Sequence, residues 1–155
     1  MVSKGRLYTF GISGVLSCFD ATTEKLEWRK EFSGQFKETW PAFGTAMSPI
    51  VDHGLLIAHV GGDDNGALTA FDAGTGAEKW SWKGEGPAYA SPILVDLGGA
   101  PLDPGRSSPQ SRKNLVGVSA STGELLWQIP FTTNHNQNIV TPLLYQQTLI
   151  FSGLG

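Results

Sequence analysis

A tryptophan that returns at regular intervals constrains the fold of this chain more than any other feature. Three stretches share one pattern, in which a small residue is followed ten positions later by a tryptophan; the pairs are Cys18 and Trp28, Ala70 and Trp80, and Gly117 and Trp127. Successive copies are about 50 residues apart, the length of one supersecondary unit in many repeat proteins. The sequence therefore predicts similar units packed side by side, each burying its apolar faces against its neighbours.

A second marker indicates that these units are made of strands. A hydroxyl residue and a proline open an apolar run three times, at Ser48-Pro49, Ser91-Pro92 and Thr141-Pro142. Proline is tolerated as the first residue of a strand because its missing N–H is not needed there. Glycine is abundant, with 20 of 155 residues, and only 16% of residues are charged, which favours short strands and tight turns. We expect an all-β fold, a β-propeller with blades of four antiparallel strands, A to D.

The two markers divide residues 1–155 as a single partial propeller. We expect strands B to D of a first blade and a connecting loop in residues 1–47, with no strand A before them; a full blade in 48–90; a third blade in 91–140; and the first two strands of a further blade in 141–155. Propellers generally have four or more blades. We therefore expect an open arc, whose missing neighbours are the remaining blades of a longer parent chain.

The third blade departs from this scheme where its strand B would lie. Residues 98–112 contain Pro101, Pro104 and Pro109, and a proline cannot donate a hydrogen bond within a central strand. We expect strand B to be lost here. Two explanations stay open: a Pro-rich surface insertion, or a slip of the reading frame that recovers at Lys113.

The segment between strands C and D carries the most regular residues of the repeat. In the middle copy, Asp72 and Thr75 can bond nearby backbone groups, and Gly76 accepts a positive φ angle. The tryptophan that follows is expected to pack against the neighbouring blade. The first copy has Glu24 in place of the glycine and the third has Ser119 in place of the aspartate, so we expect weaker locking between turn and tryptophan in those two copies.

These residues resemble the repeat of a known family. The motif Ala-x-Asp-x-x-Thr-Gly-x-x-x-Trp of the pyrroloquinoline-quinone (PQQ)-like β-propeller repeat is matched at all five positions by Ala70, Asp72, Thr75, Gly76 and Trp80. The family includes propellers of quinoprotein alcohol dehydrogenases and a lipoprotein of the outer-membrane barrel-assembly machinery. The resemblance implies a periplasmic or exported parent protein. A Kelch propeller is the rival interpretation, favoured by paired glycines at 61–62 and 98–99, but it does not explain the spacing from Thr-Gly to Trp.

The connections between blades and between strands B and C are expected on one face of the propeller, the loop face, and the C-to-D turns on the other. Loops that rim a propeller channel often bind ligands. Candidate ligand-binding residues are aromatic or amide-bearing loop residues that suit a sugar, a peptide or a quinone: Trp40, Tyr89, Asn134, His135, Asn136 and Asn138. The alternative is that the aromatic residues pack the loops and the asparagines make turns.

Other candidate sites are weaker. Asp63, Asp64 and Asn65 lack the ligand spacing of a calcium loop and are interpreted as a solvated hairpin. The histidines at 53, 59 and 135 have no metal-binding spacing, and Cys18 is expected to pack in the core. Quinone-dependent dehydrogenases of the resembled family need a vicinal cysteine pair, calcium ligands and an aspartate base, and a single cysteine excludes the pair. We expect no cofactor, no metal site and no catalytic residue in this chain.

Charge and hydropathy narrow the choice of partners. The formal net charge is −3 and the 11 lysines and arginines are scattered, so nucleic acid is not expected as a partner, and no apolar run is long enough to span a membrane. The leading hypothesis is a non-catalytic binding or scaffold module that contacts a protein or a small molecule through its loop face. The alternative is a fragment of a PQQ-dependent alcohol or sugar dehydrogenase, which would bring PQQ and calcium.

Overall fold

The computed structural model describes residues 1–62, 65–96, 106–108, 113–133 and 138–153, with backbone alone for 106–108. Every regular element within these ranges is a strand, and strands that follow each other in sequence pair antiparallel within each sheet. The first sheet consists of β1 (Val2–Ser3), β2 (Arg6–Phe10), β3 (Val15–Asp20) and β4 (Leu26–Glu31), and the second of β5 (Ile50–Asp52), β6 (Leu55–Gly62), β7 (Asn65–Asp72) and β8 (Glu78–Trp82). The third consists of β9 (Ile93–Val95), β10 (Arg106–Ser108), β11 (Asn114–Ser119) and β12 (Leu125–Pro130), and a two-stranded sheet of β13 (Leu143–Tyr145) and β14 (Thr148–Ile150) follows.

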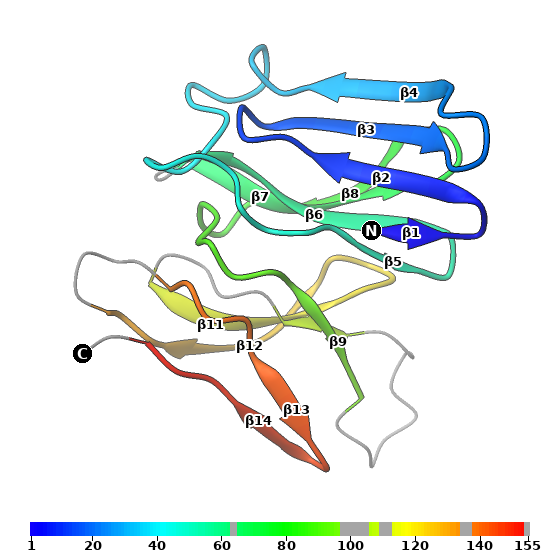
Figure 1. Cartoon of the computed structure of the whole chain (residues 1–155). Coiled ribbons are helices and arrows are strands. Elements are labelled where there is room, and N and C mark those ends of the chain that lie inside the picture. Colours follow the sequence, from blue (N-terminus) through cyan, green and yellow to red (C-terminus); the bar gives the residue numbers. More distant parts are fainter. Residues whose placement is uncertain (63–64, 97–105, 109–112, 134–137, 154–155) are drawn as a thin grey trace.

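The sheets succeed one another along an arc that does not close, with the first sheet and the β13–β14 hairpin at its two ends (Figure 1). The all-β class, the four-stranded antiparallel units and the partial propeller are thus as predicted. Large apolar side chains are exposed on the outer strand β12 and on the β13–β14 hairpin, among them Leu126, Ile129, Leu143 and Tyr145. These are the surfaces that further neighbouring sheets cover in a repeat architecture.

The prediction that the first blade lacks strand A is wrong. Val2 pairs with Leu7 and Ser3 with Arg6, so β1 is a genuine although very short inner strand. A two-residue strand leaves no periodic pattern in the sequence. The signal that it does leave is the turn Lys4-Gly5, where both residues have positive φ angles of 47° and 74°, the geometry of a tight hairpin.

The expected loss of strand B in the third blade does not hold for residues 106–108. The backbone of β10 pairs with Val95, Leu94 and Ile93 of β9 on one side and with Ser119 and Val118 of β11 on the other. These three residues lie between Pro104 and Pro109, so the prolines flank the ladder and do not interrupt it. The origin of the Pro-rich segment, insertion or frame slip, stays a prediction.

The second sheet forms the centre of the core because both of its faces are covered. Along β6, Leu56, Ala58 and Val60 pack toward the first sheet, while Ile57 points the other way, toward Val116 of the third sheet. Side chains alternate across a strand, and burial of both faces requires an almost unbroken apolar run. Each fully buried aliphatic side chain contributes about 1.5 to 3 kcal/mol, so the second sheet has the most to lose from core substitutions.

Candidate functional site

The C-to-D turn of the second sheet is held by one carboxylate, as its sequence predicts. The Oδ1 atom of Asp72 accepts hydrogen bonds from the backbone N–H of Gly74 and of Thr75 and from the Thr75 hydroxyl, each at 3.0 Å. Gly76 closes the turn with φ +71°. The Thr75 hydroxyl and then its N–H stabilise the charged form and lower the pKa of Asp72. This carboxylate is therefore committed to the turn.

The repeat tryptophans of the first two sheets, Trp28 and Trp80, each contact the turn of the sheet that follows. The indole Nε1 of Trp28 donates to the Ala73 carbonyl at 3.1 Å, and that of Trp80 donates to the Ala120 carbonyl at 3.0 Å. A Cβ atom added to Gly76 would lie 2.9 Å from the Trp28 ring, and one added to Gly123 would lie 2.6 Å from the Trp80 ring. Glycine is thus needed at this position both for its φ angle and for the close approach of the ring.

The two divergent copies depart from this arrangement in different ways. In the first, Asp20 Oδ1 accepts from Thr22 N, Thr23 N and Thr23 Oγ1 at 2.7 to 3.0 Å, so that turn is intact. Its divergent residue, Glu24, holds a positive φ of 58°, which costs a residue with a side chain about 1 to 2 kcal/mol. In the third, the Ser119 hydroxyl accepts from Thr122 N at 3.3 Å, a longer bond to a neutral acceptor.

A second contact between sheets was missed by the sequence reasoning. The backbone N–H of Ser48 donates to the Ser91 hydroxyl at 2.9 Å, and the N–H of Ser91 donates to the Thr141 hydroxyl at 3.1 Å. The hydroxyl residue before each proline therefore joins successive sheets at the start of their inner strands. The repeated Ser/Thr-Pro pair was visible in the sequence, but only its proline received a role.

On the loop face, the structure brings Tyr89 together with Phe43. The Phe43 N–H donates to the Tyr89 hydroxyl at 3.1 Å, and the two ring centroids are 6.3 Å apart. Trp40 lies in the same loop as Phe43, and its side chain is 45% exposed. Both predicted aromatic residues of the rim are thus found on loops of this face. Phe43, which was not among the candidate residues, is 74% exposed.

Asn138 has a different role from the one expected for a ligand-binding residue. Its side chain is fully buried, and its Nδ2 donates to the Phe131 carbonyl at 3.1 Å. Its own backbone carbonyl accepts from the N–H groups of Tyr89 and Ala90 at 3.2 and 3.1 Å. Asn138 therefore orders the loops beneath Tyr89. The other predicted rim residues, Asn134, His135 and Asn136, lie outside the described residues, as do Asp63 and Asp64 of the expected hairpin.

The exposed apolar residues of these loops form what we call the loop-face apolar surface: Ile12, Trp40, Phe43, Ile139 and Val140. Contacts connect its parts, because Ile12 packs against Gly44, Phe43 against Tyr89, and Tyr89 bonds to Asn138 beside Ile139. Two further bonds fix it: Thr45 N–H to the Ile12 carbonyl, and the Thr39 hydroxyl to the Ser13 carbonyl, both at 3.1 Å. These hydrogen bonds therefore fix the conformation of the surface without a bound partner.

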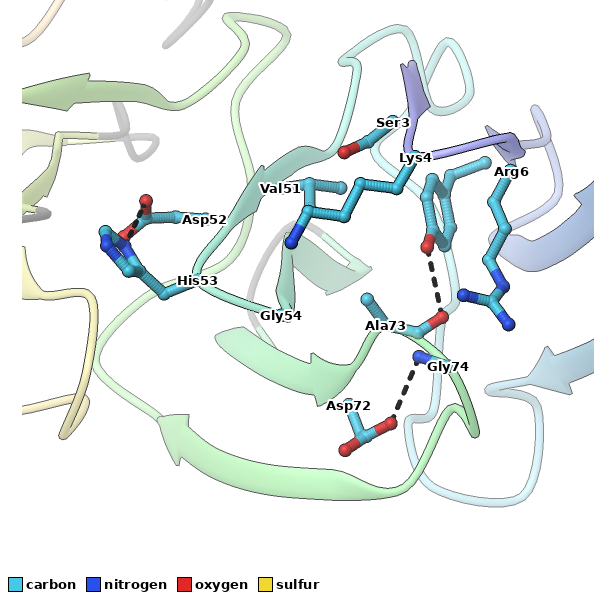
Figure 2. A pocket seen from close by; sticks show the side chains of 11 residues that line it. Ser3, Lys4, Arg6, Val51, Asp52, His53, Gly54, Asp72, Ala73 and Gly74 are labelled. Atoms are coloured by element: carbon cyan, nitrogen blue, oxygen red, sulfur yellow. Dashed lines mark hydrogen bonds and ion pairs between the residues drawn. The ribbon is translucent and has the colours of Figure 1, made fainter.

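The opposite face, which carries the C-to-D turns, contains a pocket of about 400 Å³ between the first and second sheets. The β1–β2 hairpin contributes Lys4 and Arg6, and the second sheet contributes Gly54, Ala73 and Gly74. Figure 2 shows the Lys4 and Arg6 side chains extending from the first sheet over the backbone of Gly54, Ala73 and Gly74. Tyr8 also lines this pocket, and its hydroxyl donates to the Ala73 carbonyl at 3.1 Å. The sequence reasoning did not foresee this pocket.

The titratable side chains of Cys18 and His59 are both buried. Cys18 lies in the core, where burial and a hydrogen bond to Glu27 raise the pKa of its thiol to about 11. The packing role predicted for Cys18 is confirmed. His59 is also buried; its Nε2 lies 2.8 Å from the Glu85 carbonyl, and burial lowers its pKa to about 4. Among the described residues there is no group of three or more His, Cys, Asp or Glu side chains suited to hold a metal ion, and no helix long and apolar enough to cross a membrane.

Comparison with known proteins connects this architecture to a family. The family model described as outer membrane protein assembly factor BamB matches residues 1–153. A search of curated proteins finds no significant match. Among solved structures, BamB from Moraxella catarrhalis is similar over 96% of this chain and 39% of its own, with a TM-score of 0.65 and 14% identity.

Quinohemoprotein alcohol dehydrogenases are similar as well. The enzyme from Comamonas testosteroni matches 96% of this chain and 30% of its own, with a TM-score of 0.60 and 18% identity, and the one from Pseudomonas putida matches 96% and 29%, with a TM-score of 0.58 and 20% identity. At these identities the likeness shows a shared fold alone. The predicted PQQ-like repeat is confirmed, and the chain spans 29 to 39% of the length of these structures.

Proposed function

Because the chain belongs to the BamB family, whose model matches residues 1–153, we propose that it is a non-catalytic propeller segment that acts as a binding or scaffold module through its loop face. The observation that carries this proposal is the loop-face apolar surface. Its members Ile12 and Phe43 are 68% and 74% exposed although the loops that bear them are fixed by hydrogen bonds. Rigid, exposed aromatic and aliphatic groups are typical of protein interaction sites.

The use made of the repeat residues supports a scaffold role. Asp72 and Thr75 hold a turn, and Trp28 and Trp80 each donate a hydrogen bond to the following sheet. The Ser91 hydroxyl accepts a hydrogen bond from the preceding sheet. The recurring residues are thus engaged in joining blades. The loops, which differ from repeat to repeat, remain free to determine what is bound.

The partner in this proposal is a protein segment or a small molecule with apolar groups, and the neighbours along the arc are the remaining blades of a longer parent. The name of the family refers to the outer membrane, which supports a periplasmic or exported parent. An alternative proposal is a segment of a PQQ-dependent alcohol or sugar dehydrogenase, supported by the fold likeness to quinohemoprotein alcohol dehydrogenases. Under that alternative the cofactor PQQ and calcium would be held by the parent.

Substitution in the longer parent tests the proposal. Phe43→Ser and Trp40→Ser remove the two most prominent aromatic groups of the surface, and Leu26→Ser is a matched control because Leu26 is exposed but lies at the start of β4, near the opposite face. We expect a purified partner of the parent to bind Phe43→Ser at least tenfold more weakly, since buried interface aromatics often contribute about 2 kcal/mol or more. Equal affinity for all three variants contradicts the proposal, and dye reduction with alcohols after addition of PQQ and calcium favours the alternative.

A further inference from the structure

We propose that the turn-face pocket between the first and second sheets binds a small organic anion through a carboxylate or phosphate group, with Lys4 and Arg6 as the cationic contacts. This site lies on the face opposite to the loop-face apolar surface and is independent of the function proposed for that surface. Its volume of about 400 Å³ falls within the range of small-molecule sites, which are roughly 300 to 1,000 Å³.

The charged side chains that line the pocket differ in whether they have an interaction partner. The carboxylate of Asp72 is occupied by the turn amides and by Lys79 at 3.4 Å, and that of Asp52 lies 2.7 Å from the His53 ring. Lys4, in contrast, forms no ion pair with any carboxylate in the described part of the chain. Lys4 is therefore the charged side chain of the lining that has neither an ionic nor a hydrogen-bond partner within the described residues.

Arg6 supplies the second positive contact. Its Nε is bonded to the Glu27 carboxylate at 2.5 Å, which fixes the plane of the guanidinium group. Its two terminal nitrogens form no hydrogen bond within the described residues and extend toward Ala73 and Gly74 (Figure 2). A guanidinium group held at Nε offers its terminal N–H groups in a fixed fork, the geometry that suits carboxylate and phosphate oxygens.

The backbone geometry makes room for a ligand beneath these groups. Gly54, in the β5–β6 hairpin, has a φ of +83°. A Cβ atom added to it would have no heavy atom within 4 Å, so the space beside this residue of the pocket lining is open. The Ala73 carbonyl, which would otherwise repel an anion, already accepts hydrogen bonds from Tyr8 and Trp28. The groups that an anion would contact between Lys4, Arg6 and Gly54 are thus donors and glycine backbone, while the Asp52 and Asp72 carboxylates of the same lining are already hydrogen-bonded.

The test uses two probes that separate the two sources of the anionic group, N-acetylglycine for a carboxylate and inorganic phosphate for a phosphate, with sodium chloride at equal ionic strength as the reference. Binding is followed through the backbone amide resonances of Gly54 and Gly74 in the 155-residue chain. We expect at least one probe to cause saturable shifts at these amides that chloride does not cause. A response to only one probe assigns the ligand class to that source.

Variants decide whether the proposed contacts are responsible. Lys4→Gln is expected to weaken binding about fivefold, the effect of one partly screened charge, and Lys4→Arg to restore it, while Arg6→Gln weakens it further. Lys37→Gln is the matched control, because it removes an exposed positive charge on the loop face. Shifts that grow linearly with salt, that appear equally on loop-face amides, or that persist unchanged in Lys4→Gln overturn the proposal, as does the absence of saturation with both probes.

Discussion

Replacement of Gly76 by alanine should reveal how much of the stability comes from the contact between sheets. Gly76 has a φ of +71°, and its Cα lies against the Trp28 ring of the first sheet; an added Cβ would be 2.9 Å from the Cδ2 and Cε3 atoms. Real Cβ atoms do not approach ring carbons so closely, so the indole ring must move away from the turn. That movement also breaks the bond from Trp28 Nε1 to the Ala73 carbonyl.

A matched control exists in the same sheet. Gly54 has a similar φ of +83°, but a Cβ atom added there has no neighbour within 4 Å. Gly54→Ala therefore carries the conformational cost alone, about 1 to 2 kcal/mol. Gly76→Ala carries the same cost, together with about 1 to 3 kcal/mol for overpacking and about 1 kcal/mol for the lost hydrogen bond. We expect the free energy of unfolding to fall by about 2 to 4 kcal/mol more in Gly76→Ala than in Gly54→Ala.

Urea unfolding of the 155-residue chain, followed by tryptophan fluorescence and far-UV circular dichroism, measures both differences. The Trp28→Phe background sharpens the test, because a smaller ring without the N–H should remove most of the extra cost of Gly76→Ala. Equal destabilisation by the two alanine substitutions would refute the reasoning, and so would an extra cost that survives unchanged in Trp28→Phe.

Three further expectations follow from single contacts. Glu24→Gly relieves a positive φ of 58° and should raise the free energy of unfolding by about 1 kcal/mol, which denaturant titration would show as a higher midpoint; a lower midpoint would contradict it. Ser91→Ala removes the acceptor of the Ser48 N–H and should cost about 1 kcal/mol, whereas Ser91→Thr, which keeps the hydroxyl, should cost less; equal losses would show that the bond is unimportant. Burial holds the pKa of His59 near 4, below the ordinary value of about 6.5, so the unfolded chain takes up a proton first as the pH falls. Stability should be complete above pH 6.5 and should decrease by up to about 3 kcal/mol toward pH 4, and urea titrations of His59→Gln should show a flatter profile between these values.

Periodicity made the architecture predictable. The tryptophan spacing, the Ser/Thr-Pro markers and the Asp-x-x-Thr-Gly turn each follow from local chemistry that repeats, and the strands from Leu55 to Trp82 lie close to where these signals place them. Strands β1 and β10 were not predicted, because a pairing of two or three residues is set by the neighbouring strand and leaves no pattern of its own in the sequence. The markers reported the period of the fold, while its shortest elements depended on tertiary contacts.

The candidate sites were less accessible from sequence for a related reason. Asn138 was selected as a polar loop residue, yet the structure buries it to order the backbone of Tyr89. Phe43 was not selected as a candidate, yet it is exposed. Whether a loop side chain faces solvent or interior depends on how several loops meet, which no local pattern records. The pocket near Lys4 and Arg6 was not predicted for the same reason, since it forms only where two sheets come together.

The hydrogen bonds between sheets give the arrangement a chemical direction. In both kinds of contact the earlier sheet donates and the later sheet accepts: Trp28 to Ala73 and Trp80 to Ala120 on the turn side, Ser48 to Ser91 and Ser91 to Thr141 at the inner strands. A unit inserted in the opposite orientation would place its donors against the donors of one neighbour and its acceptors against the acceptors of the other. Units of this kind can therefore be exchanged or added only head to tail, so the order of the repeats along the chain also fixes the sense in which the arc winds.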